Sequence, residues 1–355
     1  MKLGNKEIEK EGKEHFLILE AGTNFYETAD ILGISIIDAA KKMALEAKDA
    51  GADAIKFQTF KAEKLASEKY AKEQFQYMSR RDTLDYGDYI EIESYCKSIG
   101  IEFMTTLFDL DGVRIIGPYL NIFKIASPDI TNTTLIKKII EFEKPIIIST
   151  GASYEKEIYD KACFIKPEKL IIMHCIASYP AKEEELNLSY IRTLNKNYPN
   201  NVIGYSDHFY SRNCWDGMYK YTNITPLITA FILGANVIEK HFTLTPEVNS
   251  SDHYHSLDKP GVISFLKKLE KVKKSIYGII KKERFPLASE KGVRENARRS
   301  LYATKNIFKG EIIKEEDIIA LRPKIFWSAF SSAETDALIG KIADKNYDKG
   351  EPIIP

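Results

Sequence analysis

Residues 237–246 read VIEKHFTLTP, in which two aliphatic residues are followed at once by an acid, a base and an imidazole. Glu239 and His241 therefore end a segment that otherwise has the composition of a buried strand. The same pattern occurs upstream, where residues 202–210 read VIGYSDHFY and His208 follows an apolar run. Ionisable groups at the ends of buried strands are typical of folds that collect their chemistry where strands end.

Short apolar runs of this kind recur along the chain and alternate with longer amphipathic segments. Eight of them are rich in Val, Ile, Leu and Phe almost without interruption, as strands buried on both faces are. They are FLILEAG (16–22), AIKFQTF (54–60), EFMTTLF (102–108), IFKIAS (122–127), PIIIST (145–150), LIIMHC (170–175), VIGYSDH (202–208) and VIEKHF (237–242). Helical spacing between them is clearest over 35–52, 131–142 and 260–280. This alternation predicts a (β/α)₈ TIM barrel over residues 1–283.

The composition and the periodicity of the sequence change after the predicted barrel. Residues 284–293 are polar, contain one proline and are predicted to be a linker. Residues 294–355 consist of short β-like segments separated by glycines, without a helical period of any length. They predict a second domain that is small and mostly β.

Composition excludes several classes of function. The 355 residues include 51 Lys and Arg against 51 Asp and Glu, so no global charge favours nucleic acid or an anionic membrane. No apolar run approaches the ~20 residues that a membrane span requires, and the charged N-terminus does not resemble a signal peptide. The cysteines form no C-x-x-C pair, which argues against a disulfide framework or a zinc knuckle: Cys96, Cys163, Cys175 and Cys214. We expect a cytoplasmic protein with neither membrane nor nucleic-acid partners.

In a (β/α)₈ barrel the carboxyl ends of the strands converge on one mouth, where the chemistry takes place. Here almost every predicted strand finishes in a polar or ionisable group: Glu20, Lys56, Gln58, Thr105, Thr106, Lys124, Ser127, Ser149, Thr150, His174, Ser206, Asp207, His208, Glu239, Lys240 and His241. Polar strand ends are ordinary where loops begin. Their recurrence over eight strands, with lysines and histidines among them, predicts an active site.

His208 and His241 are candidates to share one divalent metal ion, because they end neighbouring strands of the predicted barrel. Imidazole suits several first-row metals, and a site with two histidines leaves positions for substrate and water. Glu239 lies two residues before His241 and therefore points to the same side of its strand. It is a candidate ligand, partner of a ligand, or base. A structural role in the core or at the surface is the alternative for each histidine.

Lys56 and Lys124 are expected to hold an anion, because a buried lysine requires a negatively charged partner. Neutral donors are predicted nearby, and together they favour a cradle for a phosphate or carboxylate: Thr106, Ser127, Ser149, Thr150 and Ser206. The alternative makes one lysine a Schiff-base nucleophile, which needs an apolar pocket and a depressed pKa.

Seven ordered motifs resemble those of the N-acetylneuraminate (sialic acid) synthases and their legionaminate and pseudaminate synthase relatives. They are GADAIKFQTF (51–60), FKIAS (123–127), IISTGA (147–152), HCIASYP (174–180), GYSDH (204–208), IEKHFTL (238–244) and DHYHSL (252–257). Residues 298–323 also resemble the antifreeze-like (SAF) domain that follows the barrel in these enzymes. The resemblance covers nearly the whole chain.

The resemblance implies a reaction in which phosphoenolpyruvate (PEP) condenses with an open-chain N-acyl hexosamine to give a nine-carbon 2-keto acid and phosphate. It implies that His208 and His241 hold a divalent metal, Mn or Mg, and that Glu20 lies near the reacting centre. The implied PEP-binding residues are Lys56, Thr106, Lys124, Ser127, Ser149 and Ser206. The implied sugar contacts are Gln58, Asp129, Tyr179 and Asp252, with Arg322 reaching the partner's site in a domain-swapped homodimer.

The chain departs from the family's pattern at Phe25, Thr28, Ala177 and Lys324, and its 213–223 segment is longer than the family norm. We expect these differences around the sugar end of the pocket or its lid. They leave open which hexosamine is the substrate.

The sequence also allows other interpretations. His253 and His255 are expected to belong to a polar lid, with a second metal site as the alternative. A Schiff-base aldolase or lyase acting on a similar keto acid is the alternative enzyme. A sugar-binding relative with a decayed pocket is the alternative without catalysis, although the retention of both histidine and lysine pairs and of Glu20 argues against it.

Overall fold

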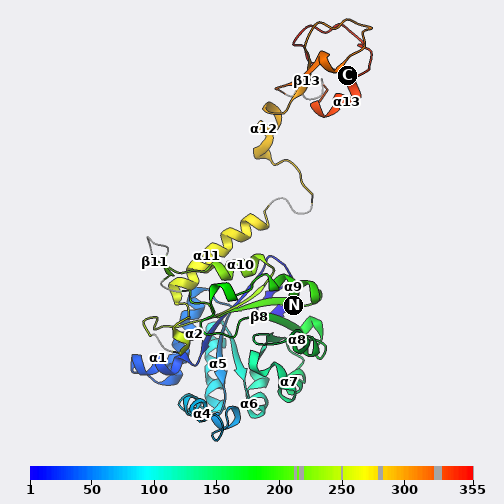
Figure 1. The fold of residues 1–355 in the computed structure, drawn as a ribbon. Helices are drawn as coiled ribbons and strands as arrows, with labels where there is room; N and C mark the ends of the chain where they lie inside the picture. Colours follow the sequence, from blue (N-terminus) through cyan, green and yellow to red (C-terminus); the bar gives the residue numbers. More distant parts are fainter. Residues whose placement is uncertain (212–213, 216–219, 249–250, 279–282, 324–329, 355) are drawn as a thin grey trace. The chain divides into compact units, whose positions relative to one another are not determined.

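Eight parallel strands close into a barrel in the computed structural model, with helices around the outside (Figure 1). The strands are β3 (Phe16–Gly22), β4 (Ala54–Thr59), β5 (Glu102–Leu107), β6 (Phe123–Ile125), β7 (Ile146–Ser149), β8 (Leu170–Cys175), β9 (Val202–Asp207) and β12 (Val237–His241). Around the barrel they follow sequence order, and β12 closes it against β3. All eight predicted strands are confirmed.

The structure describes residues 1–211, 214–215, 220–248, 251–278, 283–323 and 330–354. They form two units, Met1–Tyr277 and Gly278–Pro355. No helix in this described part of the chain is both long and apolar enough to cross a membrane.

The helices of the first unit follow the barrel strands. They are α1 (Asn24–Leu32), α2 (Ile36–Ala50), α3 (Ala62–Leu65), α4 (Lys72–Ser79), α5 (Tyr86–Ile99), α6 (Leu110–Ile116), α7 (Thr133–Ile140), α8 (Glu155–Ala162), α9 (Tyr190–Asn197), α10 (Thr225–Ile232) and α11 (Lys259–Ile276). Helix α2 illustrates their origin: Ser35 caps its N-terminus, Gly51 ends it at a φ of 95°, and Met43 lies on its buried face. The three predicted helices correspond to α2, α7 and α11.

The inward-facing positions of the barrel change character along the strands. Towards the amino ends they are apolar and share one cluster, which includes Phe16, Ile18, Ala54, Met104, Ile147, Met173 and Val237. Side chains alternate between the two faces with a period of two, so the next inward residues lie two positions further along. These are polar in most strands: Glu20, Lys56, Thr106, Ser149, Ser206 and Glu239. An apolar floor thus supports a polar layer at the carboxyl end.

A small hairpin closes the amino end of the barrel. Strands β1 (Lys2–Leu3) and β2 (Lys6–Glu7) pair antiparallel, and Leu3 and Ile8 join the apolar cluster inside the barrel. The polar end is therefore the end at which loops can admit a substrate.

The second unit has its own small core. Strands β13 (Ser300–Ala303) and β14 (Ile318–Leu321) pair antiparallel, and the core contains Leu301, Ala303, Ile307, Ile313, Ile318, Leu338, Ala343, Tyr347 and Ile353. One short helix there, α13 (Thr335–Leu338), was not expected from the sequence.

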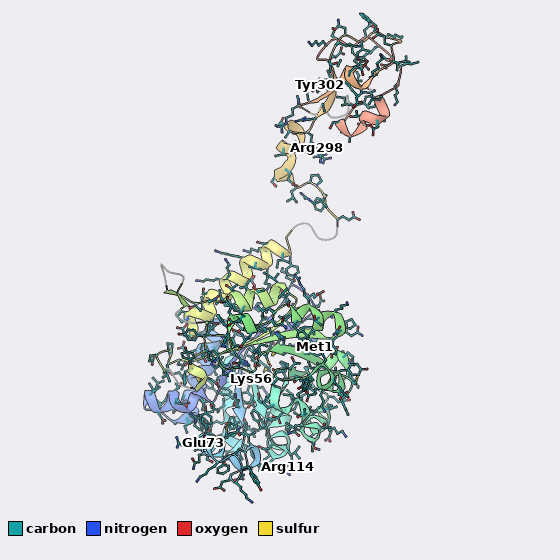
Figure 2. All side chains as sticks on the ribbon, in the orientation of Figure 1. Met1, Lys56, Glu73, Arg114, Arg298 and Tyr302 are labelled. Carbon is teal, nitrogen blue, oxygen red and sulfur yellow. The ribbon has the colours of Figure 1, made fainter. Side chains whose placement is uncertain are left out.

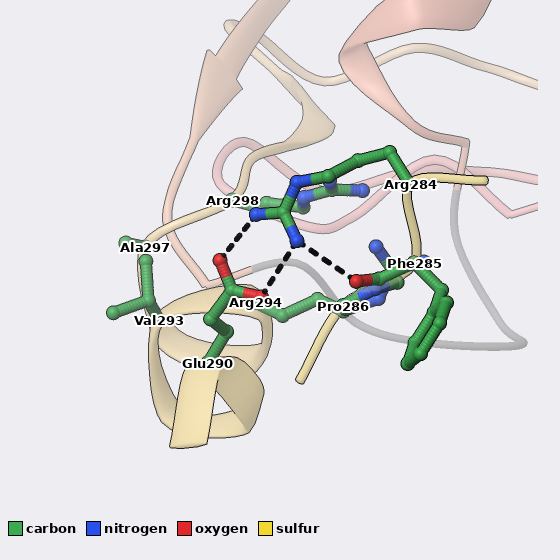
Figure 3. Close-up of a pocket in the computed structure, with 8 residues that line it drawn as sticks. All are labelled: Arg284, Phe285, Pro286, Glu290, Val293, Arg294, Ala297 and Arg298. Atoms are coloured by element: carbon green, nitrogen blue, oxygen red, sulfur yellow. Dashed lines mark hydrogen bonds and ion pairs between the residues drawn. The ribbon is translucent and has the colours of Figure 1, made fainter. Parts of the chain in front are cut away.

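The start of the second unit is more ordered than its polar composition indicates. Helix α12 (Lys291–Asn296) follows a 3₁₀ turn, and Arg284 binds Glu290 with 2.7 Å between Nη2 and Oε1 (Figure 3). Arg284 and Glu290 line a pocket together with Phe285 and Val293, whose side chains are exposed.

Candidate active site

Four of the predicted groups on β9 and β12 face one pocket at the carboxyl end of the barrel. Ser206 and Glu239 lie side by side in the register of the two strands, and Ser206 Oγ donates to Glu239 Oε1 at 2.9 Å. His208 and His241 line the same pocket one step closer to its mouth, with 5.6 Å between their ring centroids. Alternate residues of the two strands therefore face the pocket.

The residues between these four face the other way and pair with each other. Lys240 Nζ lies 2.7 Å from Asp207 Oδ2, with both side chains fully buried, and also donates to the carbonyl of Phe209 at 2.6 Å. Tyr205 donates its hydroxyl to Asp207 Oδ1 at 2.8 Å. A buried charge must be both paired and hydrogen-bonded, and these contacts satisfy that requirement. Asp207 and Lys240 are therefore structural neighbours of the site rather than members of it.

Two lysines and two carboxylates form a connected group at the bottom of the pocket. Lys56 Nζ lies 2.5 Å from Glu20 Oε2 and 3.6 Å from Glu239 Oε2. Lys124 Nζ donates to Ser149 Oγ at 2.7 Å and lies 3.8 Å from Glu239 Oε1. Lys56 and Lys124 occur inside their strands, not after them, so both are deeply buried (Figure 2 labels Lys56). When both carboxyl groups are ionised, two positive and two negative charges balance before any substrate enters.

The pKa values in this group follow from burial and from the neighbouring charges. Burial raises the pKa of Glu20 to about 7, although Lys56 opposes the shift. Burial opposes the charged form of Lys56, but Glu20 and Glu239 outweigh it and raise its pKa. Burial lowers the pKa of Lys124 despite the nearby Glu239 carboxylate. Glu20 is thus a carboxyl group that can gain or lose a proton near neutral pH.

Hydroxyl groups surround the two lysines. Thr106 Oγ1 accepts from Lys56 Nζ at 3.4 Å, and Ser127 Oγ accepts from the backbone N–H of Gly151 at 3.0 Å. A side chain at Gly151 would have its Cβ 2.8 Å from Cys175 Sγ and 2.9 Å from Ser127 Oγ, so this position requires glycine. Cys175, 3.1 Å from Ser127 Oγ, was missed as a neighbour of the site, although its inward phase on β8 follows from Met173.

The histidine rings are held in a form that presents a lone pair. His208 Nδ1 lies 2.6 Å from the carbonyl oxygen of Ile176, which only accepts, so Nδ1 carries the proton and Nε2 does not. Burial lowers the pKa of His208 to about 4 and that of His241 well below its ordinary value. Among the described residues, His241 Nδ1 is buried and has no hydrogen-bond partner. Neutral imidazoles of this kind fit a divalent metal ion.

Two further residues approach His241 from the turn that begins with 3₁₀ helix η5 (Ser251–His253). Potential ligand atoms of His241, Asp252 and His255 all lie within 4.8 Å of one another. The ring of Tyr179 lies beside this group, and its centroid is 4.2 Å from the centroid of the His208 ring. This donor set also fits a divalent metal ion.

The expected polar lid is wrong for both histidines of the turn, because both are buried. His253 is completely enclosed, with Nδ1 2.7 Å from Thr243 Oγ1. His255 is 1% exposed and lies in the cluster with His241. The short DHYH segment gave no periodic signal by which its inward residues could be recognised.

A second side of the pocket gathers Gln58 and Asp252 beside Glu20. Gln58 Nε2 donates to Glu20 Oε1 at 3.1 Å. Gly22 has a φ of 55°, and a Cβ there would lie 3.2 Å from Asp252 Oδ2 and 3.4 Å from Gln58 Nε2. Glycine therefore permits the turn after β3 and the close approach of both polar groups.

The pocket collects twelve of the fifteen predicted site residues: Glu20, Lys56, Gln58, Thr106, Lys124, Ser127, Ser149, Tyr179, Ser206, His208, Glu239 and His241. Asp252 joins them through His241 and Gly22, as described above. Asp129 does not line the pocket; its carboxylate accepts from Asn132 at 3.0 Å beside α7. Arg322 belongs to the second unit, where it is exposed.

Some strand-end residues do not reach the mouth. His174 Nε2 lies 2.9 Å from the carbonyl oxygen of Leu186, and the His174 ring packs beside Tyr190 on the outside of the barrel. Thr105 bonds the hydroxyl of Thr59, again away from the pocket. The hydroxyl of Thr150 donates to the carbonyl oxygen of Met173. Thr150 does not line the pocket and therefore does not join the cradle. These three correct the expectation that all polar strand ends converge.

The departures from the family's pattern lie in different places. Phe25 and Thr28 are buried in α1, and the ring centroids of Phe25 and Phe57 lie 5.5 Å apart. Phe25 therefore belongs to the core between strands and helices, not to the sugar end of the pocket. Ala177 lies beside Gly151. Lys324 lies outside the described residues, as does part of segment 213–223, within which β10 (Cys214–Trp215) and β11 (Lys220–Tyr221) pair antiparallel.

Comparisons with known proteins agree with this architecture. The sequence matches the NeuB family over residues 43–281 and the SAF domain over residues 298–355. N,N'-diacetyllegionaminic acid synthase of Campylobacter jejuni is 33% identical, over 96% of this chain and 99% of that protein. Pseudaminic acid synthase of the same species is 28% identical, over 99% and 98%. The crystal structure of N-acetylneuraminic acid synthetase from Leptospira borgpetersenii in complex with citrate has a TM-score of 0.69 at 30% identity, covering 82% of this chain and 94% of that one.

Proposed function

The chain belongs to the NeuB family, and on that premise we propose that it is a nonulosonic acid synthase that condenses PEP with an open-chain N-acyl hexosamine. The products are a nine-carbon 2-keto acid and inorganic phosphate. The observation that carries the proposal is the convergence of two buried lysines, several hydroxyls, two carboxylates and neutral imidazoles in one pocket.

PEP is the ligand that the lysine end of the pocket suits best. Its phosphate and carboxylate bring negative charge to Lys56 and Lys124, whose present carboxylate partners leave the group without net charge. Hydroxyl donors complete the cradle: Thr106, Ser127, Ser149 and Ser206. Charge-assisted hydrogen bonds of this type contribute roughly 1.5–3 kcal/mol each.

The hexosamine would occupy the side of the pocket towards Gln58 and Tyr179, closer to the mouth. Tyr179 offers a ring face and a hydroxyl, and Gln58 an amide, which suit the hydroxyl and N-acyl groups of a sugar. In this arrangement the aldehyde would lie between Glu20 and the imidazoles, beside the PEP cradle.

Glu20 is positioned to move protons during the reaction. A carbon–carbon bond forms between the methylene carbon of PEP and the aldehyde carbon, and protonated Glu20 donates to the aldehyde oxygen. Water then adds to the former enol carbon and returns a proton to Glu20. The bond from that carbon to the phosphate oxygen finally breaks, and the proton of the new hydroxyl leaves with the phosphate, which gives the keto group and inorganic phosphate. A pKa of about 7 suits a group that must act in both directions.

A divalent metal ion, Mn or Mg, would be held by His208 and His241 and would polarise the aldehyde as a Lewis acid when bound. The surroundings of a neutral ring decide which nitrogen presents its lone pair. For His208, the carbonyl of Ile176 holds the proton on Nδ1 and leaves Nε2 free. Glu239 lies between Ser206 and the lysines and keeps the cradle lysines aligned before PEP arrives.

One observation favours a Schiff-base aldolase as the second candidate. Burial lowers the pKa of Lys124, as an amine nucleophile requires. Lys124 nevertheless donates to Ser149, a partner that suits a positively charged anion-binding group. Borohydride in the presence of a 2-keto acid would trap a covalent adduct on Lys124 only in the aldolase mechanism.

The test of the proposed function is phosphate release from PEP with a panel of six-carbon N-acyl aldehydes and Mn²⁺. The panel includes N-acetylmannosamine and a 2,4-diacetamido-trideoxy hexose, and mass spectrometry identifies the nine-carbon product. We expect aldehyde-dependent release of one phosphate per keto acid formed. Absence of release with every aldehyde, from folded protein loaded with metal, would refute the proposal.

A further inference from the structure

We propose that Asp252 and His255 join His208 and His241 as ligands of the metal ion, so that the turn after β12 supplies part of the metal site. The inference rests on the proposed function, because it concerns the same pocket. It differs from the site expected from sequence, in which the two strand-end histidines held the ion, Glu239 was a further candidate ligand and Asp252 contacted the sugar.

The separations among the three side chains fit ligands of one ion better than they fit direct hydrogen bonds. His241 Nδ1 lies 3.7 Å from Asp252 Oδ2, and His255 Nε2 lies 4.0 Å from Asp252 Oδ1. A good N–H···O bond spans about 2.7–3.2 Å. Two ligands bound at ~2.1 Å each lie at most about 4.2 Å apart. Both Asp252 separations fall between these limits.

Burial supports the same assignment. His241 and His255 are 4% and 1% exposed, so bulk water does not solvate their rings. His241 Nδ1 has no hydrogen-bond partner among the described residues, and a buried polar atom in that state needs a compensating contact. A metal ion between His241 and Asp252 supplies that contact and explains why the carboxylate faces the ring without bonding it.

The composition of the site also indicates the class of metal. The rings of His208 and His255 lie 5.6 Å and 4.6 Å from that of His241, so three imidazoles and one carboxylate gather in one place. Mg²⁺ prefers oxygen ligands, whereas imidazole nitrogen suits first-row transition ions such as Fe, Ni, Cu and Zn. We therefore infer a site that selects a first-row transition ion over Mg²⁺.

The experiment is a titration of the apoprotein with Mn²⁺, in which electron paramagnetic resonance measures the free aqueous ion. His255→Ala and Asp252→Asn should each weaken Mn²⁺ binding by about 10- to 100-fold or more, since loss of a group that merely supports a ligand already costs that much. Tyr254→Phe is the matched control, because Tyr254 lies between the two ligands in sequence and stacks on Tyr210. It should bind Mn²⁺ as the wild type does.

Pulsed measurements on the wild-type complex provide a readout that needs no variant. Nitrogen couplings from more than two imidazoles are expected, and Mg²⁺ should displace Mn²⁺ only at large excess. Unchanged Mn²⁺ affinity in folded His255→Ala and Asp252→Asn, with binding lost in His241→Ala, would overturn the inference and leave the proposed function standing. Tight Mn²⁺ binding without phosphate release from PEP would do the reverse.

Discussion

Lys240 Nζ lies 2.7 Å from Asp207 Oδ2 directly behind the two strand-end histidines, and neither charged side chain is exposed. The pair joins β9 to β12 on the face opposite the pocket. It accounts for Asp207 in one motif and Lys240 in the other, since each directly precedes an inward-facing histidine and itself faces outward. The pair therefore fixes the relative position of His208 and His241.

Lys240→Met should destabilise the barrel by about 3–5 kcal/mol, because it leaves the Asp207 carboxylate buried and unpaired. Urea unfolding followed by circular dichroism measures the change. The double variant with Asp207→Asn should recover part of the loss. Lys156→Met, which removes an exposed lysine from its contact with Asp160, is the matched control and should leave the midpoint unchanged. An equal midpoint for Lys240→Met would show that the buried pair does not stabilise the fold.

His208→Ala and His241→Ala should each lower turnover on the order of 10³-fold or more, as expected when a Lewis acid is lost. The measurement is phosphate release at saturating Mn²⁺ on variants shown to be folded. His174→Gln is the matched control: it alters a third strand-end histidine that faces away from the pocket and should keep near-normal activity. Wild-type rates in either alanine variant would contradict the metal assignment.

Lys124→Met should weaken PEP binding far more than sugar binding. It removes one cation from the cradle while the ligand's negative charge remains, at a cost of about 3–5 kcal/mol. Calorimetric titration with PEP and with the hexosamine separates the two effects. If PEP affinity is unchanged, Lys124 has another role and the aldolase mechanism gains support.

The dependence of activity on pH should report Glu20. Burial raises its pKa to about 7, so the carboxyl is protonated below that pH and ionised above it. Ionisation removes the proton donor and adds negative charge beside PEP, so kcat/KM should fall as pH rises through about 7. Glu20→Gln should be slower and should lack this inflection. Ionisation of PEP itself affects both proteins equally, so an identical profile in the variant would exclude Glu20 as its source.

Arg322 should act across a dimer, inserted into the partner's pocket, if the arrangement implied by the family resemblance holds. Arg322→Ala and His241→Ala chains, each inactive alone, are mixed under conditions of subunit exchange. Mixed dimers then contain one site with both lesions and one intact site, so activity should return to a fraction of wild type. No recovery despite demonstrated exchange would exclude action in trans.

The strands and most of the pocket could be predicted because their signals are periodic or local. Continuous apolar runs specified all eight strands, and the two-residue period placed Glu239 and His241 on one face. The direction in which a residue near a strand end faces was harder to predict. His174 and Thr150 follow apolar runs as the site residues do, and yet they face away from the pocket. The burial of His255 could not be predicted, because it depends on where a nonperiodic turn returns to the barrel.

The alternation along β9 and β12 has a consequence for how such a protein can diversify. A single residue inserted into or deleted from either strand would shift its phase, sending Lys240 or Asp207 into the pocket and a histidine out of it. The reacting groups would be exchanged for their structural neighbours in one step. Changes of length are therefore tolerable in loops and forbidden in these strands. New sugar preferences must arise by substitution at fixed strand positions or by remodelling the turns above them.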